Sequence, residues 1–320
     1  MKLDKQNEID KTIQFWQKLF IDELNTQNKS SNTIKTYNRV LNEFKEFCYI
    51  EEVLSLKDVN KYFFNSYIDY LKQKGLSNNT INLHIATIKH FFKYISENNT
   101  DYIDILSNID KIKKIKDNQK HKEIITFTSL EWERIYNELV RSLDKAKSYN
   151  RYTKPFALFL IYHTGMRADE VLHLKRESFE VEDDVYKIKI KGKGDKERFN
   201  YISIDVVEEY LDKLYKLQKK AGIENEYLFV TKQLNIMNYV NLLLYNHNLL
   251  KKLQITNPQK QGLHTYRHTF ASRLVAQGVN MQIIKDWLGH SSILTTSMFY
   301  AKADEMAKKG VVNMGFLKKR

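Results

Sequence analysis

Four side chains toward the end of the chain have the types and spacing needed to handle a phosphate group. His264 and Arg267 are three residues apart, so on a helix they share one face and can point at one anion. Arg267 offers a planar fork of donors that fits two phosphate oxygens, and His264 can transfer a proton near neutral pH. His290 adds a third cation and Tyr300 a phenol. A histidine and an arginine at this spacing are, taken alone, more often structural residues. The other residues of the segment are therefore needed to indicate a phosphate-binding site.

The same segment allows a metal site, because His264 and His268 are four residues apart, as in zinc-binding helices. It lacks a glutamate between the two histidines and a set of cysteine ligands. The only cysteine, Cys48, excludes internal disulfides and most zinc sites. We therefore expect no metal, and we expect Cys48 to lie in a hydrophobic core.

Three motifs follow one another in the last two-thirds of the chain. The first is TGMRADEVLHL at 164–174, and the second is GKGDKER at 192–198. The third runs from HTYRH at 264–268 through LGHSS to TTSMFY, which ends at Tyr300. In this order they resemble the conserved boxes of the tyrosine recombinases. The combination is far more specific than any one motif.

The resemblance implies a nucleophile and a base. Tyr300 would attack the phosphorus of DNA and form a 3′-phosphotyrosyl bond, which preserves the energy of the broken linkage, so no ATP and no cofactor are expected. His264 would assist removal of the phenol proton. Many family members place the tyrosine nine residues after the histidine of the third motif, which is Phe299 here, whereas Tyr300 is at ten. The alternative is that Phe299 replaces the nucleophile.

The resemblance also implies how the phosphate is held. Arg167, Arg267 and His290 would neutralise its oxygens in the transition state, which is the work that Mg²⁺ does in polymerases. Glu170 would orient Arg167 or a neighbouring histidine. His268 would likewise support the phosphate-binding residues without contacting the phosphate itself. By itself, the pair Arg167 and Glu170 is equally typical of a surface salt bridge.

Residues 185–204 alternate as strands around a Gly-Lys-Gly-Asp turn and predict a β-hairpin. A lysine at such a turn is exposed and can reach into a DNA groove. The resemblance assigns Lys193, with Lys196 as second choice, as the acid that protonates the leaving 5′ oxygen. Hairpin tips also carry lysines simply for solubility.

The composition agrees with a DNA-binding protein of two domains. The 320 residues are 42% hydrophobic and 12% aromatic, enough for two cores, and the net charge of +13 points to a polyanion. A membrane surface is the runner-up, but no long uncharged apolar run and no signal peptide are visible. We expect a cytoplasmic, nucleoid-associated protein without membrane contact.

The elements divide into a helical part and a mixed part. Residues 1–110 predict four amphipathic helices, near 7–25, after Ser31, over 56–74 and after Ser77, that resemble the family's core-binding domain. Residues 111–127 form a basic linker, and 128–320 form a mixed α/β catalytic domain with a C-terminal tail. The expected fold is therefore mainly α with a small antiparallel sheet, arranged as a C-shaped DNA clamp. Candidate phosphate contacts outside the catalytic residues are Lys35, Arg39, Lys89, Lys93, Lys111, Lys113, Lys114 and Lys116.

The predicted function is site-specific recombination of double-stranded DNA, with a dimer on one site and a homotetramer on two. An Xer-type enzyme that resolves chromosome dimers, with a DNA translocase as possible accessory protein, is the first candidate, and a mobile-element integrase is the second. A type IB topoisomerase-like enzyme and a DNA-binding protein without chemistry are the alternatives from other classes. The apolar tail after Gly310 is expected to dock on a neighbouring protomer.

Overall fold

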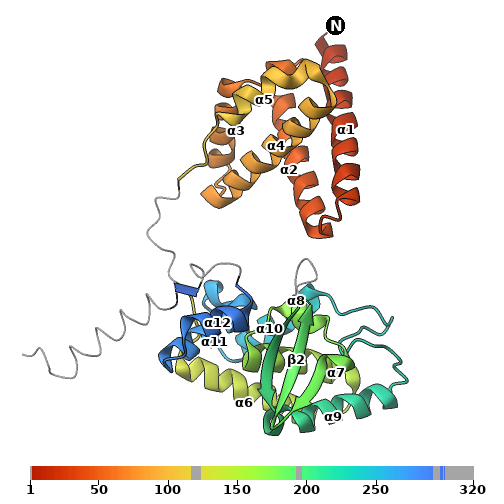
Figure 1. The fold of residues 1–320 in the computed structure, drawn as a ribbon, viewed down its shortest axis with the longest axis vertical. Coiled ribbons are helices and arrows are strands. Elements are labelled where there is room, and N and C mark those ends of the chain that lie inside the picture. Colours follow the sequence, from red (N-terminus) through yellow and green to blue (C-terminus); the bar gives the residue numbers. More distant parts are fainter. Residues whose placement is uncertain (1, 117–123, 192–196, 291–295, 298, 300–320) are drawn as a thin grey trace, which may run out of the picture. The chain divides into compact units, whose positions relative to one another are not determined.

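The computed structural model describes residues 2–116, 124–191, 197–290, 296–297 and 299. It divides into two compact units, Met1–His121 and Lys122–Arg320. Figure 1 shows that both are mainly helical and that the second also holds a small sheet, as predicted.

Helices alone build the described part of the first unit. They are α1 (Lys2–Thr26), α2 (Ser31–Ile50), α3 (Lys61–Gln73), α4 (Asn78–Asn98) and α5 (Ile103–Asp110), with 3-10 turns at Leu56–Asp58 and Thr100–Tyr102. The side chains of Ser30, Asn60 and Ser77 cap α2, α3 and α4 by accepting hydrogen bonds from backbone N–H groups. Two predictions need correction. The third helix begins at Lys61 because Asn60 caps it there, and α5 was not predicted.

The core of this unit is aromatic. Rings from α1, α2, α3 and α4 pack edge to face and tilted, with centroids 5–6.5 Å apart, a geometry that favours aromatic pairs. Cys48 is buried among them, as predicted. The fully buried rings are Phe20, Phe44, Phe47, Phe64, Tyr67, Phe91 and Phe92.

The second unit combines helices with one antiparallel sheet. Its helices are α6 (Ser129–Lys145), α7 (Tyr149–Thr164), α8 (Ala168–Leu172), α9 (Ile204–Lys220), α10 (Tyr239–Lys252), α11 (His264–Ala276) and α12 (Met281–Leu288), with 3-10 turns at Arg176–Ser178 and Pro258–Lys260. The strands are β1 (Phe179–Glu182), β2 (Val185–Lys191) and β3 (Glu197–Ser203), in that order across the sheet. The predicted hairpin is confirmed, with Lys191 opposite Glu197. β1 was missed because four residues are too few to show an alternating pattern.

Helix α7 is the centre of this unit. Its apolar run, residues 156–162, is buried on all sides, and α6, α8, α9, α10, α11 and β3 contact it (Figure 1). Because α7 is surrounded, its last residue, Thr164, lies where β3, α8, α11 and α12 come together. The motif that follows Thr164 is thereby placed among the other motifs.

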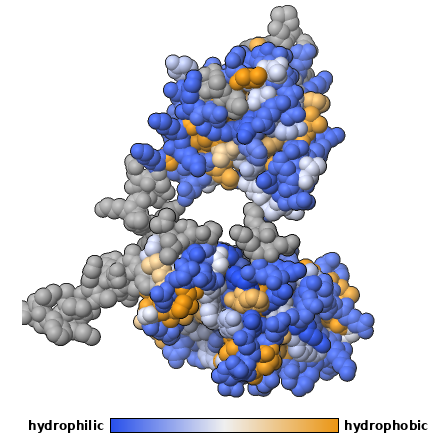
Figure 2. Space-filling model, in the orientation of Figure 1, coloured by the Kyte–Doolittle hydropathy of each residue, from blue (hydrophilic) through white to orange (hydrophobic). Residues whose placement is uncertain are grey.

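The surface of both units is largely polar. Figure 2 shows hydrophilic residues over most of the visible face, with apolar residues in small separate areas. Among the described helices, none is both long and apolar enough to span a membrane.

Candidate active site

Arg167 is held at a sharp turn between α7 and α8. Gly165 ends α7 with φ of 65°, a left-handed conformation, and a Cβ there would lie 2.4 Å from the ring of Phe270. Only glycine fits this turn without displacing that ring. The chain then leads through Met166, fully buried, into Arg167 at the N-terminus of α8. The side chain of Arg167 is 39% exposed, so its guanidinium can be reached by a ligand.

Glu170 is hydrogen-bonded to Arg167 through both carboxylate oxygens. Its two oxygens accept hydrogen bonds from the Arg167 backbone nitrogen at 2.7 Å and from Nη1 at 2.8 Å. Glu170 also binds Arg198 Nη2 at 2.5 Å, an interaction that was not predicted. Burial alone raises the pKa of the Glu170 carboxyl, but the charge of Arg198 and the hydrogen bonds from both arginines outweigh it and lower that pKa. Glu170 is therefore ionised at neutral pH.

Arg267 is buried and bound to backbone oxygens. Its guanidinium donates to the carbonyl of Gly165 at 3.0 Å and to the carbonyl of Leu288. Burial, followed by the nearby charge of Arg167, lowers the pKa of Arg267 to about 9. The charges of Arg167 and Arg267 act on one another, and together they favour the approach of an anion.

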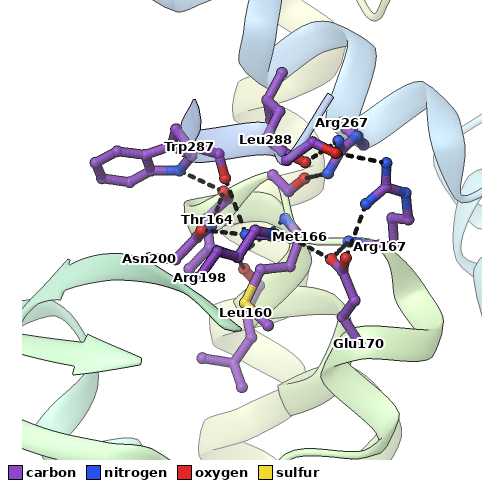
Figure 3. Close-up of polar contacts among 12 residues, drawn as sticks. Leu160, Thr164, Met166, Arg167, Glu170, Arg198, Asn200, Arg267, Trp287 and Leu288 are labelled. Carbon is purple, nitrogen blue, oxygen red and sulfur yellow. Dashed lines mark hydrogen bonds and ion pairs between the residues drawn. The ribbon is translucent and has the colours of Figure 1, made fainter. Parts of the chain in front are cut away.

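The end of α12 organises the cations. Three successive carbonyls accept hydrogen bonds from three different arginines: Trp287 from Arg198, Leu288 from Arg267, and Gly289 from Arg167. Figure 3 shows these side chains converging on the helix end. The last carbonyls of a helix have no partner within it and carry partial negative charge, so they offset part of the repulsion between the arginines.

His290 follows this helix end directly. Gly289 takes a left-handed conformation, and the His290 nitrogen donates back to the carbonyl of Lys285 at 3.0 Å. Nδ1 of His290 lies 3.0 Å from the hydroxyl of Thr296. Burial and then the charges of Arg267 and Arg167 lower the pKa of His290 to about 4. The imidazole is therefore neutral at pH 7 and not the third cation expected from the sequence.

His264 and His268 stand one turn apart at the start of α11. His264 is exposed and its ring lies 6.2 Å from that of His268, centroid to centroid. Desolvation, Arg267 and Arg167 lower the pKa of His264, so it is neutral and able to accept a proton. His268 is partly buried and hydrogen-bonded to the backbone of Ile125. Among the residues that the structure describes, no three His, Cys, Asp or Glu side chains form a group able to hold a metal.

Phe299 lies at the position nine residues after His290. Its ring is 4% exposed, stacks over His290 at 6.4 Å and lies 5.7 Å from the ring of His268. It packs in a small core with Val275 and Leu288. Phenylalanine has no nucleophilic atom, so this position holds the segment in place rather than reacting. Tyr300, Lys193 and Lys196 lie outside the described residues.

The candidate DNA contacts are less concentrated. Lys35 and Arg39 lie on α2, beside Lys74, around a shallow surface depression. Lys89 donates to the carbonyl of Asp110 at 2.9 Å, at the end of α5, and so is partly engaged within the protein. Lys93 is 3.8 Å from Glu97. The lysines at 111, 113, 114 and 116 are all exposed.

No role was predicted for Arg198, Asn200, Trp287 and Thr164. Asn200 Nδ2 and Trp287 Nε1 both donate to the carbonyl of Thr164, at 3.0 and 2.8 Å. The sequence held one signal for Asn200. It is a polar residue on the buried face of β3, where Ile202 of the same strand and Ile188, opposite it on β2, are apolar. Its partner Thr164 is 36 positions away and could not be recognised from the sequence.

Comparison with known proteins agrees with this fold and site. A sequence model described as Phage integrase family matches residues 126–306, more than half of the chain, and one described as Phage integrase SAM-like domain matches residues 13–99. The chain therefore belongs to the phage integrase family of tyrosine recombinases. It is a site-specific recombinase of this type, with a SAM-like N-terminal domain and a catalytic domain. Enzymes of this class need neither metal nor ATP.

Relatives match over nearly the whole chain. Tyrosine recombinase XerC of Rickettsia typhi is 29% identical over 306 residues, which cover 91% of this chain and 92% of that protein. Tyrosine recombinase XerD of Rickettsia bellii is 28% identical over 297 residues, 89% and 92% of the two chains.

Two solved structures share the fold. XerH recombinase bound to a palindromic difH substrate, in a post-cleavage complex, superposes with a TM-score of 0.76 at 22% identity, over 89% of this chain and 80% of that one. The Tn1549 transposon integrase in complex with transposon right end DNA gives a TM-score of 0.64 at 19% identity, over 94% and 99%.

Proposed function

We propose that this recombinase cleaves and rejoins double-stranded DNA with Tyr300 as nucleophile. The observation that carries the proposal is the convergence of Arg167, Arg267 and His290 on the end of α12, where their free donors can meet one phosphate. The positive net charge and the DNA-bound state of the similar XerH structure support DNA as the substrate. Phe299, next in the chain, cannot supply the nucleophile.

The chemical step balances without an outside reactant. The Tyr300 oxygen attacks phosphorus, a bond forms between them, and the bond from phosphorus to the 5′ oxygen breaks. His264 takes the phenol proton; its lowered pKa keeps the imidazole in the neutral form that can accept it. Lys193 gives a proton to the leaving oxygen. Attack by a 5′-hydroxyl of a second duplex reverses the step and exchanges strands.

Charge on the phosphate is stabilised by groups whose positions are set before the substrate arrives. Arg167 and Arg267 face the equatorial oxygens, and neutral His290, whose Nδ1 lies 3.0 Å from the Thr296 hydroxyl, donates a hydrogen bond from Nε2 in the proposed complex. Because the acceptors of Arg167 and Arg267 are backbone carbonyls and Glu170, little reorganisation is needed during the reaction.

We also propose the domain roles predicted from the sequence: core binding by 1–110, a basic linker over 111–127, and catalysis by 128–320. The exposed lysines of 111–116 support DNA contact by the linker. Ile112 and Ile115 pack against the first unit, and Phe127 belongs to the core of the second, so both ends of the linker are anchored.

For the biological role, we propose Xer-type resolution of chromosome dimers by a tetramer on two sites, with a DNA translocase as accessory partner. The XerC and XerD relatives support it. The similarity to the Tn1549 integrase supports mobile-element integration as the second candidate.

One experiment tests the chemistry and its class together. The purified protein, in buffer with EDTA, is mixed with a duplex that carries two copies of a target site recovered from covalently trapped protein. We expect a protein–DNA adduct on the 3′ side and Holliday junctions. Relaxation of supercoiled DNA without junctions would indicate a topoisomerase, and binding without adducts would leave only a DNA-binding protein.

A further inference from the structure

Arg198 has no role in the chemistry proposed above, yet it joins two of the motifs. It lies on β3 with its side chain 15% exposed, and its guanidinium is hydrogen-bonded to Glu170, Asn200 and Trp287. Nη1 donates to Asn200 Oδ1 at 2.5 Å and to the carbonyl of Trp287 at 2.9 Å, while Nη2 donates to Glu170 at 2.5 Å. One guanidinium thus bridges the carboxylate beside Arg167 and the helix end that leads to His290.

The partners of Arg198 are fixed in turn. Asn200 and Trp287, which both accept hydrogen bonds from Arg198, each donate a hydrogen bond to the carbonyl of Thr164, the last residue of α7. Figure 3 shows Arg198, Asn200 and Trp287 grouped around this carbonyl, with Glu170 on the other side of the guanidinium. The network therefore connects β3, α7, α8 and α12 through one side chain.

The backbone next to His290 is packed against this guanidinium. A Cβ added to Gly289 would lie 2.6 Å from Nε of Arg198, and Gly289 has φ of 63°. A residue with a side chain would push the guanidinium away as well as strain the turn. The close approach ties the position of the turn before His290 to the position of Arg198.

We propose that Arg198 is a positioning residue of the recombinase: it fixes Glu170, and through it Arg167, in register with the end of α12 that presents His290. It acts through these residues and does not contact the phosphate. The inference rests on the proposed function, because it needs Arg167 to bind the scissile phosphate.

The physical effect has two parts. Without Arg198, Glu170 has Arg167 as its remaining arginine partner, and the tighter ion pair makes Arg167 less available to the phosphate. At the same time α12 loses the hydrogen bond at Trp287, so the turn that carries His290 can shift. A displacement of about 1 Å in a catalytic group can lower the rate about 10²-fold.

The test is single-turnover cleavage at saturating DNA, with thermal melting and DNA affinity measured on the same samples. Arg134→Met is the matched control, because Arg134 also donates to the carbonyl at a helix end, Leu253 after α10, but lies outside the network. We expect Arg198→Met to cleave about 10²-fold more slowly, with DNA affinity within about threefold of the control.

Two further variants exclude a merely structural role. Arg198→Lys keeps the positive charge but lacks the two guanidinium nitrogens that reach Glu170 and Trp287 together. It should therefore restore only part of the cleavage rate. In the double variant Arg167→Ala/Arg198→Met, the loss should be clearly smaller than the product of the two single losses, because the part of the effect that passes through Arg167 is already gone. If Arg198→Met does not fold, Arg198→Lys carries the test.

The outcomes separate the two proposals. Absence of adducts with the wild-type protein would contradict the proposed function. If the wild type cleaves, then a rate of Arg198→Met or Arg198→Lys equal to that of Arg134→Met overturns the inference. Losses that multiply in the double variant also overturn it, since they show that Arg198 and Arg167 act independently.

Discussion

The carboxylate of Glu170 binds Arg167 twice, with one oxygen 2.7 Å from the backbone nitrogen and the other 2.8 Å from Nη1. The same carboxylate pairs with Arg198, and its side chain is only 10% exposed. Glu170 thus lies between two guanidiniums and, among the described residues, is the carboxylate paired with both in a site that would receive another anion.

Removing this anion should destabilise the fold. Glu170→Ala leaves the poorly exposed Arg198 without its partner, and breaking a buried pair costs about 3–5 kcal/mol. We expect the free energy of unfolding to fall by about 3 kcal/mol, measured by urea denaturation. Glu177→Ala is the control, because Glu177 is 79% exposed and 3.8 Å from Lys175, so its loss should cost under about 0.5 kcal/mol. Equal losses for both variants would show that Glu170 is not a buried partner.

His163 should make stability depend on pH. Its ring lies 4.3 Å from Phe159, and its buried Nε2 has no hydrogen-bond partner among the described residues. Burial lowers its pKa from 6.5 to about 4. Below about pH 6.5 the unfolded chain binds a proton at His163, whereas the folded chain binds it only near pH 4. The free energy of unfolding therefore falls as the pH decreases across this window.

The variant His163→Phe tests this dependence. Its stability relative to the wild type should be about 2 kcal/mol more favourable at pH 5 than at pH 7.5, because about 1.5 pH units below 6.5 correspond to roughly that amount. Denaturant unfolding at both pH values measures the difference. A difference that does not change with pH would mean that the imidazole is not held neutral by burial.

The nucleophile can be assigned by exchanging two neighbours. Tyr300→Phe should abolish covalent adducts on nicked suicide substrates and leave binding nearly unchanged, because one hydroxyl is removed. Phe299→Tyr should remain active, and the exchanged variant Phe299→Tyr/Tyr300→Phe should be inactive. Adducts formed by the exchanged variant would place the nucleophile at position 299, beside the ring of His290.

Substitution of the catalytic arginines should mainly lower the cleavage rate, whereas substitution of the linker lysines should mainly lower the DNA affinity. Arg167→Ala or Arg267→Ala should slow cleavage about 10²–10³-fold, as for removal of one donor to a developing oxyanion. Replacing lysines 111, 113, 114 and 116 by glutamine should instead weaken binding to all DNA. It should also reduce the slope of log affinity against log salt by about 0.9 for each phosphate that is no longer neutralised. Similar decreases in rate and affinity in both sets would refute this division.

The C-terminal tail should affect assembly. Truncation after Lys309 removes Val311, Val312, Met314, Phe316 and Leu317, which lie outside the described residues. We expect single-site binding and the melting temperature to stay the same, and the tetrameric complex on two sites to disappear from native gels. A large fall in melting temperature would show that the tail packs on its own subunit.

Local patterns in the sequence were enough to predict much of the fold. The capping box at Thr128, the hairpin over 185–204 and the buried run 156–162 were predicted correctly, because caps, alternation and apolar periodicity involve neighbours in the chain. The start of α3 and the existence of α5 were not, because the start of a helix depends on its cap and the eight residues of α5 make too few turns for a clear pattern.

The site also combines residues that could be predicted from the sequence with partners that could not. Arg167, His264, Arg267 and His290 could be singled out because their side-chain chemistry and spacing stand in the sequence itself. Their partners from distant parts of the chain could not: Arg267 binds Gly165, 102 positions away, and Arg167 binds Gly289, 122 positions away. Only the packing of α11 and α12 against the end of α7 brings these groups together. Tertiary structure alone therefore decided that one helix end would hold three arginines, and that Arg198 would be among them.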